Sequence, residues 1–380
     1  MIRWCLVSLL LFGTPVLLEA QAVTAVPTGP AGTVAGLMDF TFLTSGQVAG
    51  DPLFFVQDGS GAVAPLLQEP ASSPILKSAT LEMTYQAGKD FSWVPGSREI
   101  RLVPGSRIPT TPASGLHPAP HSPNSYDGSR DGTPWMLFGE GRFFHDRQAV
   151  ASYPTTAKWP GLVPVAAPDR ELGHLRQRLR ARQPLRLVTL GDSISTGANA
   201  SGAVGAPPLQ PGYPELVALG LEKAFGIPVT RTNLSVGGMD SNWGVTQIPR
   251  VLAETPDLVL LAFGMNDASG GRTPDDFSAK IGEILSRLQT ARPACTVIIV
   301  SPMTANPEWN RSAPLLYPAY AAKLASLTGV DCALADVTAV WSSVLERKTY
   351  LSLSGNGLNH PNDFGHQLYA ATILTRIGGK

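Results

Sequence analysis

This chain of 380 residues has no excess of charge of either sign, because 29 Lys and Arg residues balance 29 Asp and Glu residues. Charged residues make up only 15% of the total. A neutral chain has no electrostatic attraction for the phosphates of nucleic acids or for an anionic membrane surface. Partners of these two classes are therefore not expected, and the ligand is expected to be small or neutral.

Cysteine and histidine are scarce, with three and six residues respectively. His117, His121 and His145 do not have the spacing of metal ligands, and neither a metal nor an organic cofactor is expected. Two of the three cysteines, Cys295 and Cys332, each stand at the start of a predicted strand. The sequence leaves two alternatives open for this pair, a disulfide between neighbouring strands or two buried free thiols.

Long apolar runs are also missing, since none reaches the roughly 20 residues that a membrane-spanning helix needs. The apolar stretch of residues 5–18 follows Arg3 and leads to Ala20, which is the pattern of a cleavable secretory signal peptide. Residues 1–20 are therefore predicted to be a signal peptide. The protein is expected to be secreted or periplasmic, with no membrane contact after cleavage.

Residues 21–160 lack long helical periodicity and show short alternating segments instead. Examples are residues 80–85, 90–93 and 99–103, which are separated by turns with the sequence Pro-Gly-Ser-Arg. Proline presets φ at the second position of a type II turn, and glycine tolerates the positive φ of the third position. This pattern predicts a small all-β domain, a jelly-roll-like antiparallel sandwich.

The pattern changes after a proline-rich linker, which together with a charged lead-in helix occupies residues 161–182. In residues 183–380, apolar strands alternate with segments long enough for crossover helices. The predicted strands are residues 185–190, 229–233, 258–263, 296–301 and 332–336, and the predicted helices include 215–225, 274–289, 314–327 and 363–375. Such alternation is typical of an α/β/α domain with a parallel sheet.

Four residues that could take part in catalysis lie next to these elements. Ser193 follows the first strand, Gly238 the second and Asn266 the third, while His360 precedes the last helix. The carboxyl ends of parallel strands meet at one edge of a sheet, so these residues can converge there. A serine needs a base and oxyanion donors before it can act as a nucleophile. His360 is the predicted base, and the N–H groups of Ser193 and Gly238 with the Asn266 amide are the predicted oxyanion hole.

Four short blocks of sequence carry a resemblance to a known family. They are Gly191-Asp192-Ser193, the glycine that ends residues 233–238, Gly264-Met265-Asn266-Asp267, and His360-Pro361-Asn362. In this order and spacing they resemble the four blocks of the SGNH (GDSL-type) hydrolases, over residues 183–380. The resemblance implies a flavodoxin-like three-layer fold, a serine nucleophile, and hydrolysis of esters, often acetyl groups on carbohydrates.

One departure from the family pattern concerns the group that orients the histidine. The family usually carries an aspartate three residues before the histidine, and Gly357 occupies that position here. Asn356, a backbone carbonyl near Leu358, or Asp363 are the candidates for this role.

Three further residues have predicted roles near the serine. Asp192 and Asp267 are expected to brace the loops around it. His366, within the predicted last helix, is the alternative candidate for the base. Ser193 alone would be interpreted as a helix cap, and the other three blocks are what favour catalysis.

These observations predict a secreted serine esterase that removes acetyl or other short acyl groups from a small-molecule or polysaccharide substrate. Two alternatives stay open. The absence of the usual aspartate would fit a catalytically weak or inactive carbohydrate-binding protein on the same fold. A lipase or thioesterase would differ only in its acyl and leaving groups.

Overall fold

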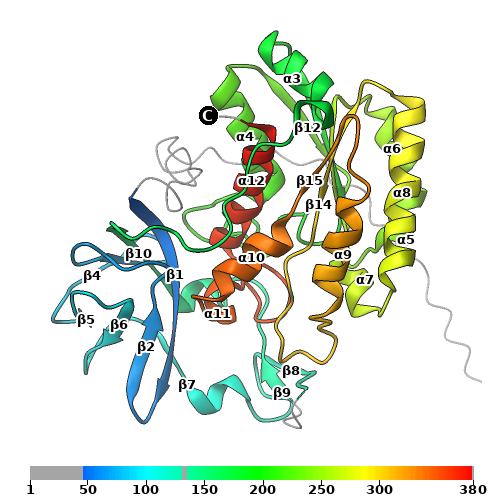
Figure 1. Cartoon of the computed structure of the whole chain (residues 1–380). Coiled ribbons are helices and arrows are strands. Elements are labelled where there is room, and N and C mark those ends of the chain that lie inside the picture. Colours follow the sequence, from blue (N-terminus) through cyan, green and yellow to red (C-terminus); the bar gives the residue numbers. More distant parts are fainter. Residues whose placement is uncertain (1–45, 131–134, 379–380) are drawn as a thin grey trace, which may run out of the picture.

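A computed structural model describes residues 46–130 and 135–378 of the chain. It contains an antiparallel β-rich domain, which is blue to cyan in Figure 1, and an α/β domain with a parallel sheet. Both fold classes expected from the sequence are confirmed. The predicted signal peptide, residues 1–20, lies outside the described residues. Among the described residues, no helix combines the length and apolar character needed to cross a bilayer.

The β domain is built on one eight-stranded sheet, in which β7 pairs with β1 beside the order β4-β3-β10-β1-β2-β6-β5. Its strands are β1 (Gln47–Asp58), β2 (Gly61–Pro65), β3 (Ile75–Ser78), β4 (Thr84–Tyr85), β5 (Phe91–Trp93), β6 (Glu99–Leu102), β7 (Thr110–Pro112) and β10 (Gln148–Pro154). A separate hairpin pairs β8 (Ser125–Asp127) with β9 (Trp135–Leu137). The first part of β1 pairs with β10 and its last part with β2, so this strand joins the two halves of the sheet.

The α/β domain has five parallel strands in the order β12-β11-β13-β14-β15. They are β11 (Leu185–Gly191), β12 (Val229–Asn233), β13 (Leu258–Ala262), β14 (Thr296–Val300) and β15 (Cys332–Ala335). Its helices are α3 (Gly173–Arg180), α4 (Tyr213–Phe225), α5 (Ser241–Thr246), α6 (Ile248–Ala253), α7 (Met265–Ser269), α8 (Pro274–Ala291), α9 (Leu316–Ala325), α10 (Val337–Leu345), α11 (Tyr350–Leu353) and α12 (Asp363–Ile377).

Helices cover both faces of the parallel sheet. Helix α12 packs against α4 and α10, while α8 packs against α5, α6 and α9 (Figure 1). Every residue of β13 and β14 is buried, which explains why these strands are continuous apolar runs without alternation. The next two strands along the chain, β12 and β13, lie on opposite sides of β11. A crevice forms at the carboxyl ends of the strands where the order reverses in this way, and such folds place their binding sites there.

Cys295 immediately precedes β14 and Cys332 begins the neighbouring strand β15, but the two do not form a disulfide. Both are free and buried, and burial raises the pKa of each thiol to about 12. Of the two alternatives that the sequence left open, the structure shows the pair of buried thiols.

Lys348, which follows α10, enters the core of the β domain. Its Nζ lies 2.6 Å from Oδ1 of Asp51, and both side chains are fully buried. The same ammonium donates to the carbonyl of Pro65 at 2.5 Å, and the hydroxyl of Tyr153 donates to Oδ2 of Asp51 at 2.7 Å. A buried ion pair whose remaining donors and acceptors are hydrogen-bonded holds the two domains in one arrangement.

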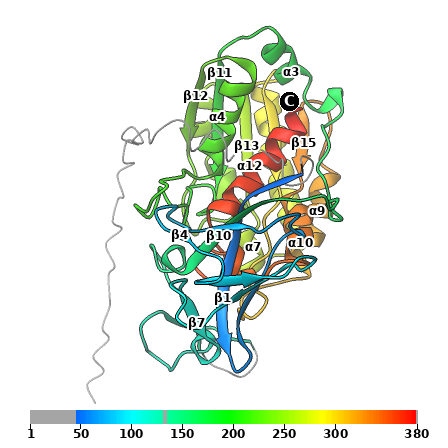
Figure 2. The same ribbon diagram turned by 90° about the vertical axis from the view of Figure 1, so that its left-hand side faces the viewer.

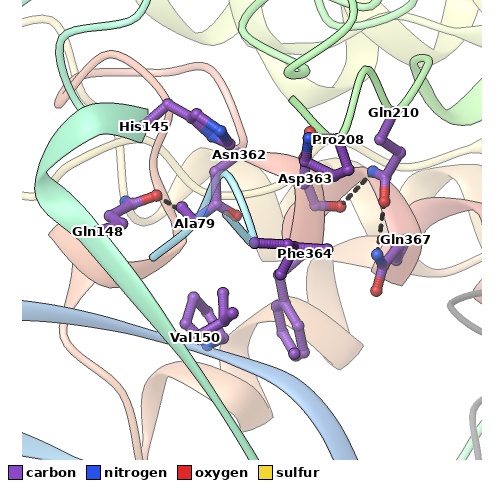
Figure 3. A pocket seen from close by; sticks show the side chains of 13 residues that line it. Ala79, His145, Gln148, Val150, Pro208, Gln210, Asn362, Asp363, Phe364 and Gln367 are labelled. Carbon is purple, nitrogen blue, oxygen red and sulfur yellow. Dashed lines mark hydrogen bonds between the residues drawn. The ribbon is translucent and has the colours of Figure 1, made fainter. Parts of the chain in front are cut away.

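The domains also meet where β10 faces the start of α12, below α12 in Figure 2. The amide of Asn362 donates to Oε1 of Gln148 at 3.0 Å, and Nε2 of Gln148 donates to the carbonyl of Ser354 at 2.9 Å. Figure 3 shows the pocket beside these residues, whose volume is about 50 Å³. It has room for no more than a few water molecules, so this interface is closely packed.

Replacing Lys348 by Met is expected to lower the free energy of unfolding by about 3–5 kcal/mol, because it leaves the buried carboxylate of Asp51 without its cation. Urea denaturation of the two proteins measures this difference. The double variant Lys348→Met with Asp51→Asn removes both charges and is expected to lose less than the two single variants together. A loss below about 1 kcal/mol in the single variant would contradict the role given to this ion pair.

Candidate active site

Ser193 lies just beyond β11, where the chain turns away from the carboxyl edge of the sheet. Its carbonyl accepts hydrogen bonds from the backbone N–H of Ala198 at 3.1 Å and the hydroxyl of Thr196 at 2.7 Å. These bonds hold the turn that presents the serine. Its Oγ lies 2.9 Å from Nε2 of His360, a residue 167 positions later in the chain.

The second nitrogen of the imidazole, Nδ1, lies 2.6 Å from Oδ1 of Asn199. The amide nitrogen of Asn199 donates to the carbonyl of Gly355 at 3.2 Å, so its oxygen must face the imidazole. An amide oxygen can only accept, and the proton of neutral His360 is therefore on Nδ1. This tautomer leaves the lone pair of Nε2 to accept the hydroxyl hydrogen of Ser193.

The three predicted orienting groups do not hold the imidazole, and that prediction was wrong. Oδ1 of Asp363 accepts the backbone N–H of Ser201 at 2.7 Å, and the carbonyl of Leu358 accepts the hydroxyl of Tyr350 at 2.7 Å. Asn356 bonds its own loop. The imidazole is instead hydrogen-bonded by Asn199, in the loop after Ser193. The spacing of the family's blocks gives no sign of this contact.

Asn356 shapes the loop that carries the histidine. Its Oδ1 accepts the backbone N–H groups of Leu358, Asn359 and His360 at 3.0, 3.0 and 3.1 Å. A single side-chain oxygen therefore holds the turn from which the imidazole extends. Its Nδ2 donates to Oε1 of Glu140, a residue of the β domain, at 3.2 Å.

Gly357 occupies the position of the family's usual aspartate, and the β domain leaves no room for a side chain there. Its φ is +89°, a conformation that other residues rarely adopt. A Cβ at this position would lie 2.7 Å from the carbonyl oxygen of Leu137 and 2.7 Å from the ring of Phe144. Both neighbours belong to the β domain, so its docking explains why glycine is required.

The expected oxyanion donors lie at the same edge of the sheet. Gly238 follows β12 with φ +78°, and Asn266 lies in α7. No described residue accepts a hydrogen bond from the backbone N–H of Ser193 or Gly238. One N–H of the Asn266 amide donates to the carbonyl of Met239 at 2.9 Å, which leaves the second for another acceptor.

Asp192 and Asp267 are buried beneath these loops. Asp192 accepts the backbone N–H of Ile194 at 3.0 Å, and burial raises its pKa to about 7. Asp267 accepts the hydroxyl of Ser241 at 2.6 Å and lies 2.7 Å from Nε of Arg272. Burial raises its pKa as well. Asp192 thus braces its own turn, and Asp267 connects α7 to the start of α5.

His366, the alternative base, does not contact Ser193. Its Nε2 lies 3.0 Å from the carbonyl of Ala198, and its Nδ1 accepts the backbone N–H of Tyr213 at 3.3 Å. Burial lowers its pKa to about 4, so it is neutral near pH 7. Both ring nitrogens are occupied, and this leaves His360 as the base candidate.

Histidines in the described part of the chain do not combine into a metal centre. No group of three or more His, Cys, Asp or Glu residues there is arranged to hold a metal ion. His145, for example, directs Nε2 to the carbonyl of Pro207 at 2.7 Å.

Residues 189–368 match the sequence profile of the GDSL-like Lipase/Acylhydrolase family. These residues form a GDSL-like domain, which makes up most of the α/β domain. The resemblance carried by the four sequence blocks is thereby confirmed. The chain is similar to an arylesterase of Vibrio mimicus, with 30% identity over 105 residues, which is 27% of this chain and 48% of the arylesterase. The chain thus spans about half the length of that relative.

Solved structures that are similar to the chain include two esterases. One is a two-domain esterase active on acetylated mannans, with 23% identity, a TM-score of 0.44, and coverage of 56% of this chain and 54% of the other. The second is a catalytic mutant of Axe2, an acetylxylan esterase of Geobacillus stearothermophilus, with 18% identity, a TM-score of 0.43, and coverage of 52% and 95%.

Replacing Asn199 by Ala is expected to lower kcat/KM for ester hydrolysis about 10- to 100-fold, because the imidazole loses the acceptor that sets its tautomer. Asn199→Asp is expected to move the acidic limb of the pH profile to higher pH, since a carboxylate favours the imidazolium. Steady-state rates from pH 4 to 9 measure both effects. Asn310→Ala, at an exposed asparagine, is the control, and full activity of Asn199→Ala would contradict the assignment.

Gly357→Asp restores the family's aspartate in sequence but is expected to reduce activity. The substitution forces a side chain against Leu137 and Phe144 at a positive φ, and it should cost about 1–3 kcal/mol of unfolding free energy. Gly96→Asp is the matched control, because Gly96 has φ +83° with open space around it. Assay and denaturation of both variants test this, and higher activity of Gly357→Asp than of the wild type would refute it.

Proposed function

We propose that the protein is a serine ester hydrolase in which Ser193 is the nucleophile and His360 the general base. The observation that carries this proposal is the 2.9 Å contact between Oγ of Ser193 and Nε2 of His360 at the carboxyl edge of the GDSL-like domain. The tautomer of His360 that Asn199 selects supports the same direction of proton transfer.

The reaction proceeds through an acyl-enzyme. Nε2 of His360 takes the hydroxyl proton as Oγ of Ser193 forms a bond to the ester carbonyl carbon. The oxyanion accepts hydrogen bonds from the N–H groups of Ser193 and Gly238 and from the amide of Asn266. The C–O bond to the alcohol then breaks, and His360 gives its proton to that oxygen. Water repeats these steps on the acyl group and releases the acid.

Burial prepares His360 for this role. The side chain is only 14% exposed, and burial lowers its pKa below the ordinary value of histidine. The imidazole is therefore neutral, and able to accept a proton, at neutral pH and somewhat below. Activity is expected to rise with pH through this lowered pKa and to level off above it.

The substrate class is proposed from the family resemblance, which implies esters and often acetyl groups on carbohydrates. We infer that the protein removes acetyl or other short acyl groups from a carbohydrate outside the cytoplasm, after cleavage of residues 1–20. Mass spectrometry of the mature N-terminus tests the export step. A mature chain that retains residues 1–20 would refute it.

Ser193→Ala is expected to lower kcat for p-nitrophenyl acetate by at least about 10⁴-fold, because the nucleophile is lost. Labelling by a fluorophosphonate probe should disappear in the same variant. Ser342→Ala, at an exposed serine of α10, should change neither result. Unchanged turnover in Ser193→Ala would refute the proposed nucleophile.

Two assays on the wild type identify the acyl group and the alcohol of the preferred ester substrate. A series of p-nitrophenyl esters of increasing chain length should show a preference for acetate, whereas a preference for long chains would indicate a lipase. Acetate release from acetylated polysaccharides tests the alcohol. Polysaccharide binding without acetate release and without probe labelling would instead support the carbohydrate-binding alternative.

A further inference from the structure

Glu140 brings a carboxylate from the β domain to the catalytic histidine. It lies in the loop after β9, and its Oε1 is 3.8 Å from Nδ1 of His360. The side chain is 55% exposed. The same oxygen accepts the amide N–H of Asn356 at 3.2 Å, which directs it toward the histidine loop.

The backbone around Glu140 is held on both sides. The N–H of Gly139 donates to the carbonyl of Asn356 at 3.1 Å, and this bond joins the loop to the GDSL-like domain. The N–H of Phe138 donates to the carbonyl of Asn124 at 3.0 Å, and its ring packs on Tyr126 with 5.5 Å between centroids. The position of the carboxylate is therefore built into the domain interface.

The partner of the imidazole, Asn199, is neutral. Its amide oxygen sets the tautomer, but it provides little stabilisation for the positive charge that appears on His360 when the proton is taken from Ser193. In the family this charge faces an aspartate at the position of Gly357. Here the β domain leaves no room for a side chain at that position. A negative charge at this edge of the ring must come from another segment.

We propose that Glu140 is a positioning residue of the hydrolase, whose carboxylate stabilises the imidazolium of His360 from the β domain. This proposal rests on the proposed function. The carboxylate acts at the Nδ1 edge, opposite the nitrogen that exchanges the proton with Ser193, so it takes no proton itself. The β domain is then part of the catalytic machinery.

Other titratable groups near His360 have different partners. His366 on α12 bonds Ala198 and Tyr213 and is neutral near pH 7. Asp363, at the start of α12, is bonded to the backbone of Ser201, and burial raises its pKa. Glu140 is the group whose charge raises the pKa of His360 against the lowering by burial.

The test is Glu140→Gln, which removes the charge and keeps an oxygen for Asn356. The plateau of kcat/KM is expected to fall about three- to tenfold, and the midpoint of the acidic limb to move about half to one pH unit lower. Both changes have one cause, since the charge that favours the imidazolium is gone. The difference from the wild type should shrink in 1 M salt, where the Debye length is about 3 Å.

Two controls accompany this variant. Glu99→Gln removes an exposed carboxylate of β6 and should leave the profile unchanged. Glu140→Asp keeps the charge, and its acidic limb should stay closer to that of the wild type than the limb of Glu140→Gln.

A Glu140→Gln profile that superposes on the wild type overturns the proposal. A lower plateau without a shift of the limb also overturns it, because the carboxylate would then act only on the shape of the loop. Neither result touches the proposed function, which is tested separately by the turnover and probe labelling of the wild type and of Ser193→Ala.

Discussion

The imidazole of His360 reaches Ser193 only while the loop between α11 and α12 keeps one shape. That loop is closed on itself, because the N–H of Gly355 donates to the carbonyl of His360 at 2.9 Å and Asn356 holds three backbone N–H groups. It is also held from outside by the β domain, through Gly139 on one side and Gln148 on the other. The geometry of the active site thus depends on the contact between the domains.

This contact connects several features that are unexpected in isolation. The β domain fills the space in which the family's aspartate would extend, so Gly357 is required and the acid is absent. Asn199 then sets the tautomer, and Glu140 brings a negative charge from the domain that displaced the aspartate. The buried ion pair of Lys348 and Asp51 holds the domains in this arrangement. Loss of any one of these contacts should therefore change the position or the pKa of the His360 imidazole.

The parts of this account that follow from local patterns could be predicted from the sequence. Buried parallel strands such as β13 and β14 are continuous apolar runs, and the sites that follow them occur at one edge of the sheet. Ser193 and His360 are accordingly in contact, and Gly238 and Asn266 follow strands that end at the same edge of the sheet, while the roles of all four are proposals. The antiparallel β domain was predictable from a different local pattern, the short alternating segments separated by Pro-Gly turns.

The rest depends on contacts between segments that no spacing relates. Asn199 has φ +61° in a loop of small residues, and Glu140 belongs to another domain, so no motif indicates that either faces the histidine. The restriction on Gly357 comes from Leu137 and Phe144, which are distant in sequence. Strand β1 was not predicted, because five consecutive residues in it are buried and the alternation of a half-buried strand is missing. The contacts of Glu140 and Gly357 appear only when the two domains are packed together.

A crystal structure of the wild-type protein with a phosphonate covalently bound to Ser193 tests the central claim most directly. The account predicts a phosphonyl oxygen about 2.7–3.1 Å from the N–H groups of Ser193 and Gly238 and the amide of Asn266. It also predicts that Nδ1 of His360 stays bonded to Asn199, with the carboxylate of Glu140 beside it. A phosphonyl oxygen directed away from these donors, or a histidine loop detached from the β domain, would contradict the account.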